Sequence, residues 1–250
     1  MQRALDILSV FDVERPSLST AEISQEVRLT LPTTHRLLKA LQSKEMVIWD
    51  RNTRRYSLGP QIIRLAGIIL QRDDLISLVE PWLQRLREAS GETASLQWRI
   101  GERRMCVREL VSPQPIRMVS GVGQLYPLVR GAAGKAILAW LRTDAIREIL
   151  DAEGVAGRKR TALLEDLDGI RKRGFATSTG ETTPGASAIA APIMAAGGDA
   201  VASLNVTGPE HRFTPRKAAA IQGLLIEAST EVMRQLGRSG DGEGRRANRA

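Results

Sequence analysis

The sequence predicts two domains of different classes: a mainly α-helical N-terminal domain that ends in a β-hairpin, and a C-terminal α+β domain built on an antiparallel sheet. Apolar residues recur at helical spacing before residue 44, and the period changes to that of strands from Thr93 onward. The 250 residues also suffice for two hydrophobic cores. Strands first, then helices, then strands again are typical of an α+β fold.

Residues 1–59 are expected to form three short helices and a hairpin. Ser19 followed by Glu22 is a capping box that begins the second helix. Thr30 is a suitable N-cap for the third, in which Pro32 costs little because first-turn amides lack intrahelical acceptors. The hairpin pairs "EMVIWD" with "RRYSLG" through the polar turn "RNT".

The remaining chain divides into three segments. Residues 60–73, "PQIIRLAGIILQRD", predict a linker helix that is apolar on nearly every side and is therefore an expected dimer contact. Residues 74–237 form the α+β domain, with strands expected at 93–101, 103–112, 115–120, 175–180, 186–194 and 200–208. Residues 238–250 contain no apolar side chain larger than that of alanine, which predicts a disordered tail.

The third helix has a second exposed face that apolar burial does not explain. In a helix-turn-helix, the second helix presents its N-terminal residues to base edges in the major groove. Arg36 is positioned to read guanine. Alternatively, Thr30 and Thr33 only cap the helix and Arg36 is solvated. Seven basic and two acidic residues within 28–59, three of the arginines at the hairpin, favour DNA contact. The predicted DNA-binding residues are Thr30, Thr33, Thr34, His35, Arg36, Lys39, Arg51, Arg54 and Arg55.

Composition narrows the choice of partner and compartment. Lys plus Arg exceed Asp plus Glu by 36 to 28, a net charge of +8 that favours polyanionic partners. The single cysteine, Cys106, excludes an internal disulfide and a Cys-based zinc site, and two histidines are too few for a three-histidine metal site. No apolar run is long enough to span a membrane. We therefore expect a cytoplasmic protein that binds no metal or cofactor and does not associate with a membrane.

The order of several motifs resembles the IclR family of bacterial transcriptional regulators. These motifs are "QRALDILSVF", "LSTAEISQEV", "PTTHRLLKALQSKEMV", "RRYSLG", "SPQPIRMVS", "GKAILA", "AAPI" and "LNVTGP", spread from about Gln2 to Leu236. The resemblance implies an N-terminal winged helix-turn-helix, a dimerising linker helix and a GAF-like effector-binding domain. It further implies a homodimer, or a tetramer made from two dimers, on a pseudo-palindromic operator. Repressor and activator roles both stay open.

The resemblance also implies an effector cavity on one face of the C-terminal sheet. Asn205 and Thr207 alternate onto one face of a strand, where buried polar groups need partners, and a ligand is one such partner. Alternatively, both side chains bond to neighbouring backbone. Ser178 and Thr179 stand where many relatives have acidic residues, which leaves Glu181 as the lone carboxylate and predicts a less acidic, more apolar cavity. The implied effector-binding residues are Met118, Tyr126, Ala132, Ala133, Ala188, Asn205 and Thr207.

Other functions fit the sequence less well. "RGAAGKA" lacks both the first glycine and the Ser or Thr of a phosphate-binding loop. Neither His35 nor His211 lies in a recognisable catalytic triad, and "GASAI" is not a nucleophile elbow. The alternatives are a GAF-like-domain enzyme and a non-specific nucleic-acid-binding protein, for which only Trp49 and Tyr56 offer stacking surfaces. The favoured partners are double-stranded DNA and a small organic metabolite, with organic and aromatic acids among the candidates.

Overall fold

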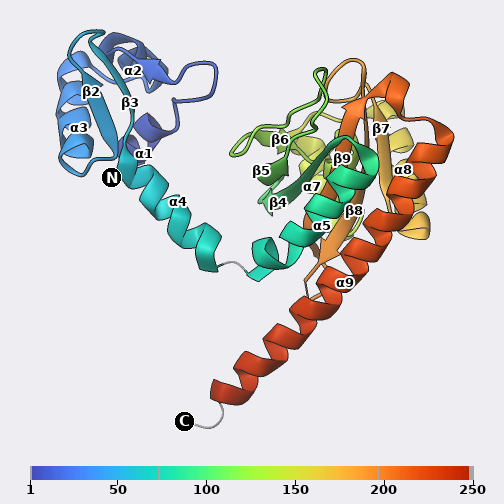
Figure 1. Cartoon of the computed structure of the whole chain (residues 1–250). Helices are drawn as coiled ribbons and strands as arrows, with labels where there is room; N and C mark the ends of the chain where they lie inside the picture. Colours follow the sequence, from blue (N-terminus) through green and yellow to red (C-terminus); the bar gives the residue numbers. More distant parts are fainter. Residues whose placement is uncertain (1, 73, 196, 248–250) are drawn as a thin grey trace. The chain divides into compact units, whose positions relative to one another are not determined.

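The computed structural model describes residues 2–72, 74–195 and 197–247, and it divides into two compact units, residues 1–73 and 74–250. Figure 1 shows the elements of both units. The N-terminal unit contains three helices, a small sheet with strand order β1-β3-β2, and a fourth helix. Its elements are α1 (Gln2–Leu8), β1 (Ser17–Leu18), α2 (Thr20–Glu26), α3 (Leu31–Ser43), β2 (Val47–Asp50), β3 (Arg55–Leu58) and α4 (Pro60–Arg72).

A small apolar core holds α1, α2, α3 and the sheet together. Its members come from every one of these elements. Packing in this core therefore stabilises the short helices, because helices of this length are not stable by intrinsic helix propensity alone. Trp49 packs against this core with its ring 4.5 Å from that of Tyr56, as expected from its strand position. The buried members are Ile7, Leu18, Ile23, Val27, Leu38, Val47 and Tyr56.

The helix starts agree with the sequence in part. The capping box is confirmed: the Glu22 N–H donates to Ser19 Oγ, and the Ser19 N–H donates to the Glu22 carboxylate. Thr30 has the extended backbone of an N-cap, but its side chain makes no capping bond. The Thr30 hydroxyl instead donates to Thr33 Oγ1 at 3.0 Å. The expected side-chain cap of α3 is therefore wrong, because the two threonines satisfy one another.

Gly59 joins the hairpin to α4 at a place where no side chain fits. Its N–H donates to the Met46 carbonyl at 2.8 Å, and a Cβ added there would lie 2.1 Å from the Glu45 carbonyl oxygen. The glycine thereby fixes the point at which the chain leaves the hairpin and enters α4. Large apolar side chains of α4 face outward within this unit, namely Ile63, Leu65, Ile68 and Ile69.

The C-terminal unit is built on a six-stranded antiparallel sheet with strand order β6-β5-β4-β9-β8-β7. Its strands are β4 (Thr93–Ile100), β5 (Arg103–Leu110), β6 (Leu125–Pro127), β7 (Ala176–Thr179), β8 (Ala186–Met194) and β9 (Ala200–Pro209). Its helices are α5 (Asp74–Ser90), α6 (Gly131–Leu138), α7 (Thr143–Ala152), α8 (Gly157–Arg173) and α9 (Pro215–Ala247), with the short 3-10 helix η1 (Glu210–Arg212) before α9.

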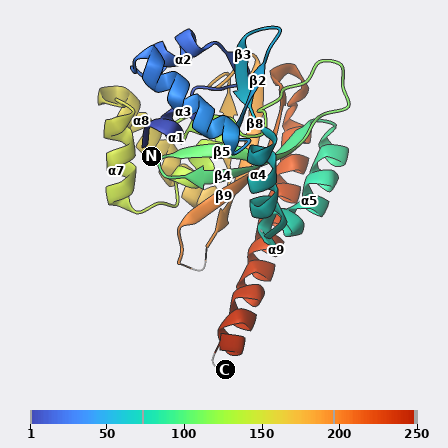
Figure 2. The ribbon, with the colours of Figure 1, turned by 90° about the vertical axis from the view of Figure 1, so that its left-hand side faces the viewer.

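The sheet has helices on both faces. Leu83 of α5 and Leu225 of α9 belong to a core with Leu204 and Val206 of β9, whereas α6, α7 and α8 pack in a second core on the other face. Figure 2 shows α5 and α9 on the opposite side of β4, β5 and β9 from α7 and α8. Because side chains alternate along a strand, Ser203, Asn205 and Thr207 lie on the α6 face, and Ser203 Oγ donates to the Ala133 carbonyl at 3.1 Å.

The C-terminal unit departs from the sequence prediction in four places. Residues 115–120 form a loop and not a strand, because side chains of other segments bind its backbone in place of a strand partner. The short strand β6 and helix α7 were not predicted. The predicted disordered tail is wrong as far as Ala247, since α9 continues to that residue and residues 248–250 lie outside the described residues. Extending an established helix costs far less than starting one.

Candidate DNA-binding surface and effector cavity

The third helix presents three positively charged or ionisable side chains to solvent. His35, Arg36 and Lys39 are exposed, and none of them forms an ion pair within the described residues. Lys39 Nζ donates to Gln42 Oε1, at 3.4 Å. Thr30 is also exposed and Thr33 is half-buried at the start of the helix. A basic helix face without ion-pair partners among the described residues is suited to binding phosphates and base edges.

Two predicted DNA-binding residues are used inside the protein. Thr34 is 0% exposed, and its hydroxyl donates to the Thr30 carbonyl at 3.0 Å. It lies one turn before the core residue Leu38, so it belongs to the inward face of α3. The Arg55 guanidinium donates to the Ser17 carbonyl at 2.9 Å and pairs with Glu22. The assignment of Thr34 to DNA contact is therefore wrong because its side chain is buried, whereas a DNA contact of Arg55 stays a prediction.

The hairpin tip keeps two arginines free of such bonds. Arg51 and Arg54 are exposed and form no ion pair within the described part of the chain. The Asp50 carboxylate accepts from the backbone N–H groups of Asn52 and Thr53, bonds that lower the pKa of Asp50. Arg54 has a φ of 54°, in the left-handed region. The turn is thus held by bonds between the Asp50 carboxylate and the turn backbone, and no bond of the Arg51 or Arg54 side chain contributes to it within the described residues.

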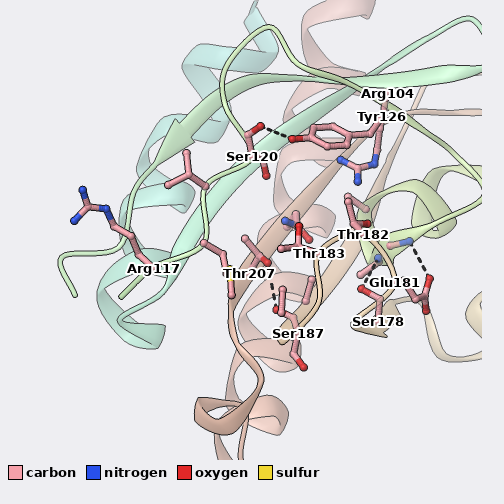
Figure 3. A pocket seen from close by; sticks show the side chains of 18 residues that line it. Arg104, Arg117, Ser120, Tyr126, Ser178, Glu181, Thr182, Thr183, Ser187 and Thr207 are labelled. Atoms are coloured by element: carbon pink, nitrogen blue, oxygen red, sulfur yellow. Dashed lines mark hydrogen bonds between the residues drawn. The ribbon is translucent and has the colours of Figure 1, made fainter. Parts of the chain in front are cut away.

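A cavity of about 160 Å³ lies on the α6 face of the C-terminal sheet. All seven residues that the family resemblance implied for the effector line it: Met118, Tyr126, Ala132, Ala133, Ala188, Asn205 and Thr207. Glu181 is the single carboxylate among its lining residues, as expected. Arg104 and several hydroxyl side chains line the cavity as well. Figure 3 shows Arg104 beside Tyr126, with Ser178 and Glu181 nearby and Arg117 pointing away.

A row of buried polar side chains crosses three strands and joins Arg104 to Asn205, which both line the cavity. Arg104 Nη1 on β5 donates to Gln97 Oε1 at 2.9 Å, and Gln97 Nε2 on β4 donates to Ser95 Oγ at 3.1 Å. Asn205 Nδ2 on β9 also donates to Ser95 Oγ, at 3.4 Å. The row is incomplete at both ends, since Arg104 Nε and Asn205 Oδ1 are buried without a hydrogen-bond partner among the described residues. Arg104 and Asn205, which both line the cavity, thus each keep one buried polar atom without a partner among the described residues.

Arg104 is the feature of the cavity that sequence reasoning missed. Its side chain is 5% exposed, and no carboxylate pairs with it in the described part of the chain. Burial lowers the pKa of Arg104 to about 10, which leaves it charged at neutral pH. Its guanidinium lies 4.6 Å from the centre of the Tyr126 ring. Such a cation–π contact contributes about 0.5–2 kcal/mol, less than the several kcal/mol that burying an unpaired charge costs.

Thr207 bonds to neighbouring backbone, because its hydroxyl donates to the Ser187 carbonyl at 3.2 Å. Asn205 does not, since its Oδ1 has no hydrogen-bond partner among the described residues. The alternating polar residues of this strand therefore include one side chain that is satisfied internally and one that is only partly satisfied.

The N-terminus of α6 forms one wall of the cavity. The Gly131 N–H donates to Glu181 Oε2 at 2.9 Å, and the Ala132 N–H donates to Ser178 Oγ at 2.9 Å. Gly131 has a φ of +74°, and an added Cβ would lie 2.5 Å from Thr182 Oγ1. The other oxygen of Glu181, Oε1, binds Lys135 Nζ at 2.6 Å. Glu181 is therefore fully engaged and is not a partner of Arg104.

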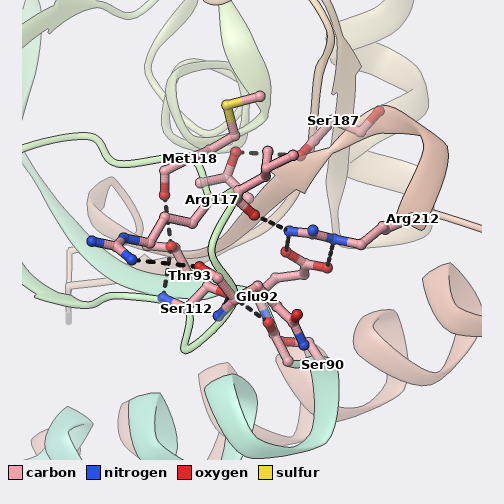
Figure 4. A network of polar contacts seen from close by, with 12 residues as sticks. Ser90, Glu92, Thr93, Ser112, Arg117, Met118, Ser187 and Arg212 are labelled. Atoms are coloured by element: carbon pink, nitrogen blue, oxygen red, sulfur yellow. Dashed lines mark hydrogen bonds and ion pairs between the residues drawn. The ribbon is translucent and has the colours of Figure 1, made fainter.

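The loop 111–124 covers one side of the cavity and is held at its base by a buried ionic cluster. Glu92 is 1% exposed and binds both Arg212 and Lys217. Burial would raise the pKa of Glu92, but the bonds from these two cations outweigh it, and the net effect lowers that pKa. Arg212 also donates to the Ile116 carbonyl at 2.7 Å. Figure 4 shows the cluster between α5 and the loop.

A second set of bonds fixes the part of the loop that lines the cavity. Thr93 Oγ1 donates to the Met118 carbonyl at 2.6 Å and accepts from the Ser112 N–H at 3.0 Å. The Tyr126 hydroxyl donates to the Ser120 carbonyl at 2.5 Å. The loop is therefore positioned by side chains of β4 and β6, and its cavity-facing residues are preorganised.

Within the described residues, no group of three or more His, Cys, Asp or Glu side chains is arranged to hold a metal ion. Cys106 is buried, and burial raises the pKa of its thiol to about 12, so it is a small core residue rather than a nucleophile. None of the helices in the described ranges combines the length and apolar character needed to cross a membrane.

A winged helix-turn-helix joined to a separate domain with a small cavity defines a ligand-responsive DNA-binding protein as a class. Comparison with known protein families supports this class. The family model for the IclR helix-turn-helix domain matches residues 1–51, and that for the bacterial transcriptional regulator IclR C-terminal domain matches residues 68–234. The chain belongs to the IclR family and is a DNA-binding transcriptional regulator.

Similar proteins support the same assignment. The chain is 33% identical over 238 residues to the HTH-type transcriptional regulator BhcR of Paracoccus denitrificans, covering 93% of this chain and 85% of that protein. It is 28% identical over 243 residues to the HTH-type transcriptional repressor AllR of Escherichia coli, covering 95% and 90% of the two chains. Both relatives are transcriptional regulators by name, and neither name describes an enzyme.

Solved structures share the fold. An IclR transcriptional regulator from Alicyclobacillus acidocaldarius matches with a TM-score of 0.85 and 23% identity, covering 94% of this chain and 97% of the other. An IclR homologue from Microbacterium hydrocarbonoxydans, solved in complex with 4-hydroxybenzoate, matches with a TM-score of 0.80 and 19% identity, covering 94% and 98%. At these identities the similarity establishes the architecture alone.

Proposed function

We propose that this regulator binds a pseudo-palindromic operator as a homodimer, and that a small organic metabolite in the C-terminal cavity changes its operator affinity. Operator binding is proposed to take place in the cytoplasm. The observation that carries the proposal is the exposed face of α3, where His35, Arg36 and Lys39 have no ion-pair partner among the described residues.

The DNA contacts divide into base recognition and phosphate binding. Arg36 lies on the exposed face near the start of α3 and is proposed to read guanine in the major groove. Arg51 and Arg54, at the tip of the wing, are proposed to bind backbone phosphate. Thr30, Thr33, His35 and Lys39 complete the proposed surface.

Dimerisation is proposed to use the apolar face of α4. Leu65, Ile68 and Ile69 are exposed within the N-terminal unit and lie on one side of that helix by their spacing. Exposed apolar side chains grouped in this way are typical of protein–protein contacts. Two dimers joined as a tetramer are an extension of the same proposal.

The effector is proposed to occupy the cavity lined by Met118, Tyr126, Ala132, Asn205 and their neighbours. Two buried polar atoms without partners support a ligand there. A structural relative of the same fold was solved with 4-hydroxybenzoate, which supports organic acids as a class to test. A ligand changes operator affinity only if it binds the DNA-competent and DNA-incompetent states unequally.

The test is a binding titration of the purified protein with its own upstream intergenic DNA and with a scrambled duplex of equal length. It is carried out at about 50 and 200 mM salt, because non-specific binding collapses with salt. We expect a preference of roughly 10³ or more for the native duplex at the higher salt. The proposal would be contradicted if the protein bound both duplexes equally at both salt concentrations and also bound relatives' operators no better than the scrambled duplex.

A further inference from the structure

We infer that Arg28, in the turn between α2 and α3, is a further DNA contact of this regulator and binds a backbone phosphate. The inference rests on the proposed function, in which α3 lies in the major groove. Arg28 is not among the residues that the sequence predicts to bind DNA. Its role follows from its backbone conformation, from its side chain and from its position in the motif.

The first observation is the backbone of Arg28. Its φ of 53° lies in the left-handed region, where glycine is the usual residue just after the end of a helix. The conformation is unfavourable for a residue with a Cβ, which comes too close to the following carbonyl oxygen. Backbone bonds close the turn: the Arg28 N–H donates to the Gln25 carbonyl at 3.2 Å, and the Leu29 N–H donates to the Ser24 carbonyl at 3.0 Å. Glycine would form the same bonds with less strain.

The second observation is the side chain of Arg28. It is exposed, and within the described residues its guanidinium forms no ion pair or hydrogen bond. The carboxylates of Asp6 and Glu26 line the same surface groove as Arg28. The Asp6 carboxylate lies 3.8 Å from the Arg3 guanidinium, and the Glu26 carboxylate pairs with Arg15. Both carboxylates are therefore engaged elsewhere, and no bond of the Arg28 side chain offsets its backbone strain.

The third observation is the position of Arg28 in the helix-turn-helix. Arg28 precedes Thr30, the exposed N-cap of α3, by two residues. In this motif the N-terminal end of the second helix contacts the bases, and backbone phosphates border the same groove. A long cationic side chain in the turn before α3 is therefore placed to bind one of these phosphates. Strained residues without an internal role are typical of functional sites.

The inference is tested by fluorescence-anisotropy titrations of the full chain with the native upstream duplex and the scrambled duplex. Arg28→Gln keeps the strained backbone and removes the charge. Each lost phosphate contact should reduce the slope of log affinity against log salt by about 0.9. Extrapolated from about 1 M salt, this is roughly fifteenfold weaker binding at about 50 mM and roughly fourfold at about 200 mM. The loss should be equal for both duplexes, because phosphate contacts carry no sequence information.

Arg28→Gly separates the DNA contact from the fold. It should lose DNA affinity as Arg28→Gln does, whereas the N-terminal unit should become more stable because glycine adopts the left-handed backbone without strain. We expect the thermal midpoint of this unit to rise by roughly 2–5 °C. The midpoint is followed in the full chain by fluorine NMR of incorporated fluorotryptophan, since Trp49 is the only tryptophan within residues 1–73.

Glu45→Gly is the matched control for the backbone. Glu45 also has a left-handed backbone, with a φ of 55°, and is exposed just after α3. Its replacement by glycine should raise the same midpoint by a similar amount. It should not weaken binding to either duplex, because it removes an anion. Arg28→Lys is the control for charge and should retain most of the salt dependence of DNA binding.

The outcomes distinguish this inference from the proposed function. Unchanged affinity and salt dependence in Arg28→Gln would overturn the inference, and so would a loss confined to the native duplex, which would indicate a base contact. A lower thermal midpoint in Arg28→Gly would assign Arg28 to the fold and overturn it as well. If the wild type bound both duplexes equally, but with a salt dependence that Arg28→Gln reduced, the proposed operator recognition would be contradicted and this inference would stand.

Discussion

Replacement of Arg36 by alanine separates base recognition from general attraction to DNA. Arg36 is exposed and has no ion-pair partner among the described residues, so its loss should change stability by no more than about 0.5 kcal/mol. A bidentate arginine–guanine contact contributes roughly 1–3 kcal/mol of discrimination. Two recognition helices on a dimer lose about 2–6 kcal/mol, which is roughly 30- to 20,000-fold in operator affinity.

The assay compares operator and scrambled duplex by fluorescence anisotropy across a range of salt concentrations. Arg36→Ala should weaken operator binding by at least the lower of these factors and change scrambled-duplex binding far less. Arg55→Ala serves as the control, because the Arg55 guanidinium binds Ser17 and Glu22 inside the domain. It should lower thermal stability without changing the sequence preference of the folded protein. Equal losses on both duplexes for Arg36→Ala would show that Arg36 contacts only phosphate.

Three further predictions concern the wing, the hairpin exit and the ionic cluster. Arg54→Gly should reduce the salt dependence of DNA binding by about one phosphate contact per head without loss of stability, since glycine tolerates its φ of 54°. Gly59→Ala should destabilise the N-terminal domain by about 2 kcal/mol or more in urea unfolding, because an added Cβ meets a backbone oxygen at 2.1 Å. Glu92→Gln should lower the free energy of unfolding by roughly 1–3 kcal/mol at pH 7, since Arg212 and Lys217 lose their partner.

The pH dependence of the last effect has a defined sign. The folded-state pKa of Glu92 is lowered, so the carboxylate stabilises the protein above its ordinary pKa near 4.5. The difference between wild type and Glu92→Gln should disappear as the pH falls through the lowered value. A difference that grows on acidification contradicts the argument. An unchanged salt dependence of DNA binding would contradict the prediction for Arg54→Gly. An unchanged midpoint of urea unfolding would contradict the prediction for Gly59→Ala.

Local sequence patterns predicted the structure well where the determining contacts are local. The capping box of Ser19 and Glu22, the hairpin at "RNT" and the start of α9 at Pro215 each depend on residues within one turn of one another. Thr34 was also predictable, because it precedes the core residue Leu38 by four positions and must share its face. Its placement at the DNA surface ignored that spacing.

Contacts between distant segments were beyond local patterns. Arg55 binds Ser17 of strand β1 and Glu22 of helix α2. Strand β1 has two residues and is too short to leave a periodic signal in the sequence. Arg104 gave a weak signal, since it lies two positions before Cys106, a residue expected to be buried, and therefore on the same face of the strand. That it lacks a carboxylate depends on the partners that Glu181 takes. Only the assembled domain shows this.

The strand order of the C-terminal sheet limits how copies of this protein can associate. Both edges of the sheet are its shortest strands, β6 with three residues and β7 with four. Long exposed edges invite pairing with other chains, and short ones offer few free N–H and C=O groups for it. The sheet is thus protected against growth by strand addition during folding, when the domain is most exposed to aggregation. Self-association is left to helical surfaces, whose side chains, unlike backbone groups, can distinguish one partner from another.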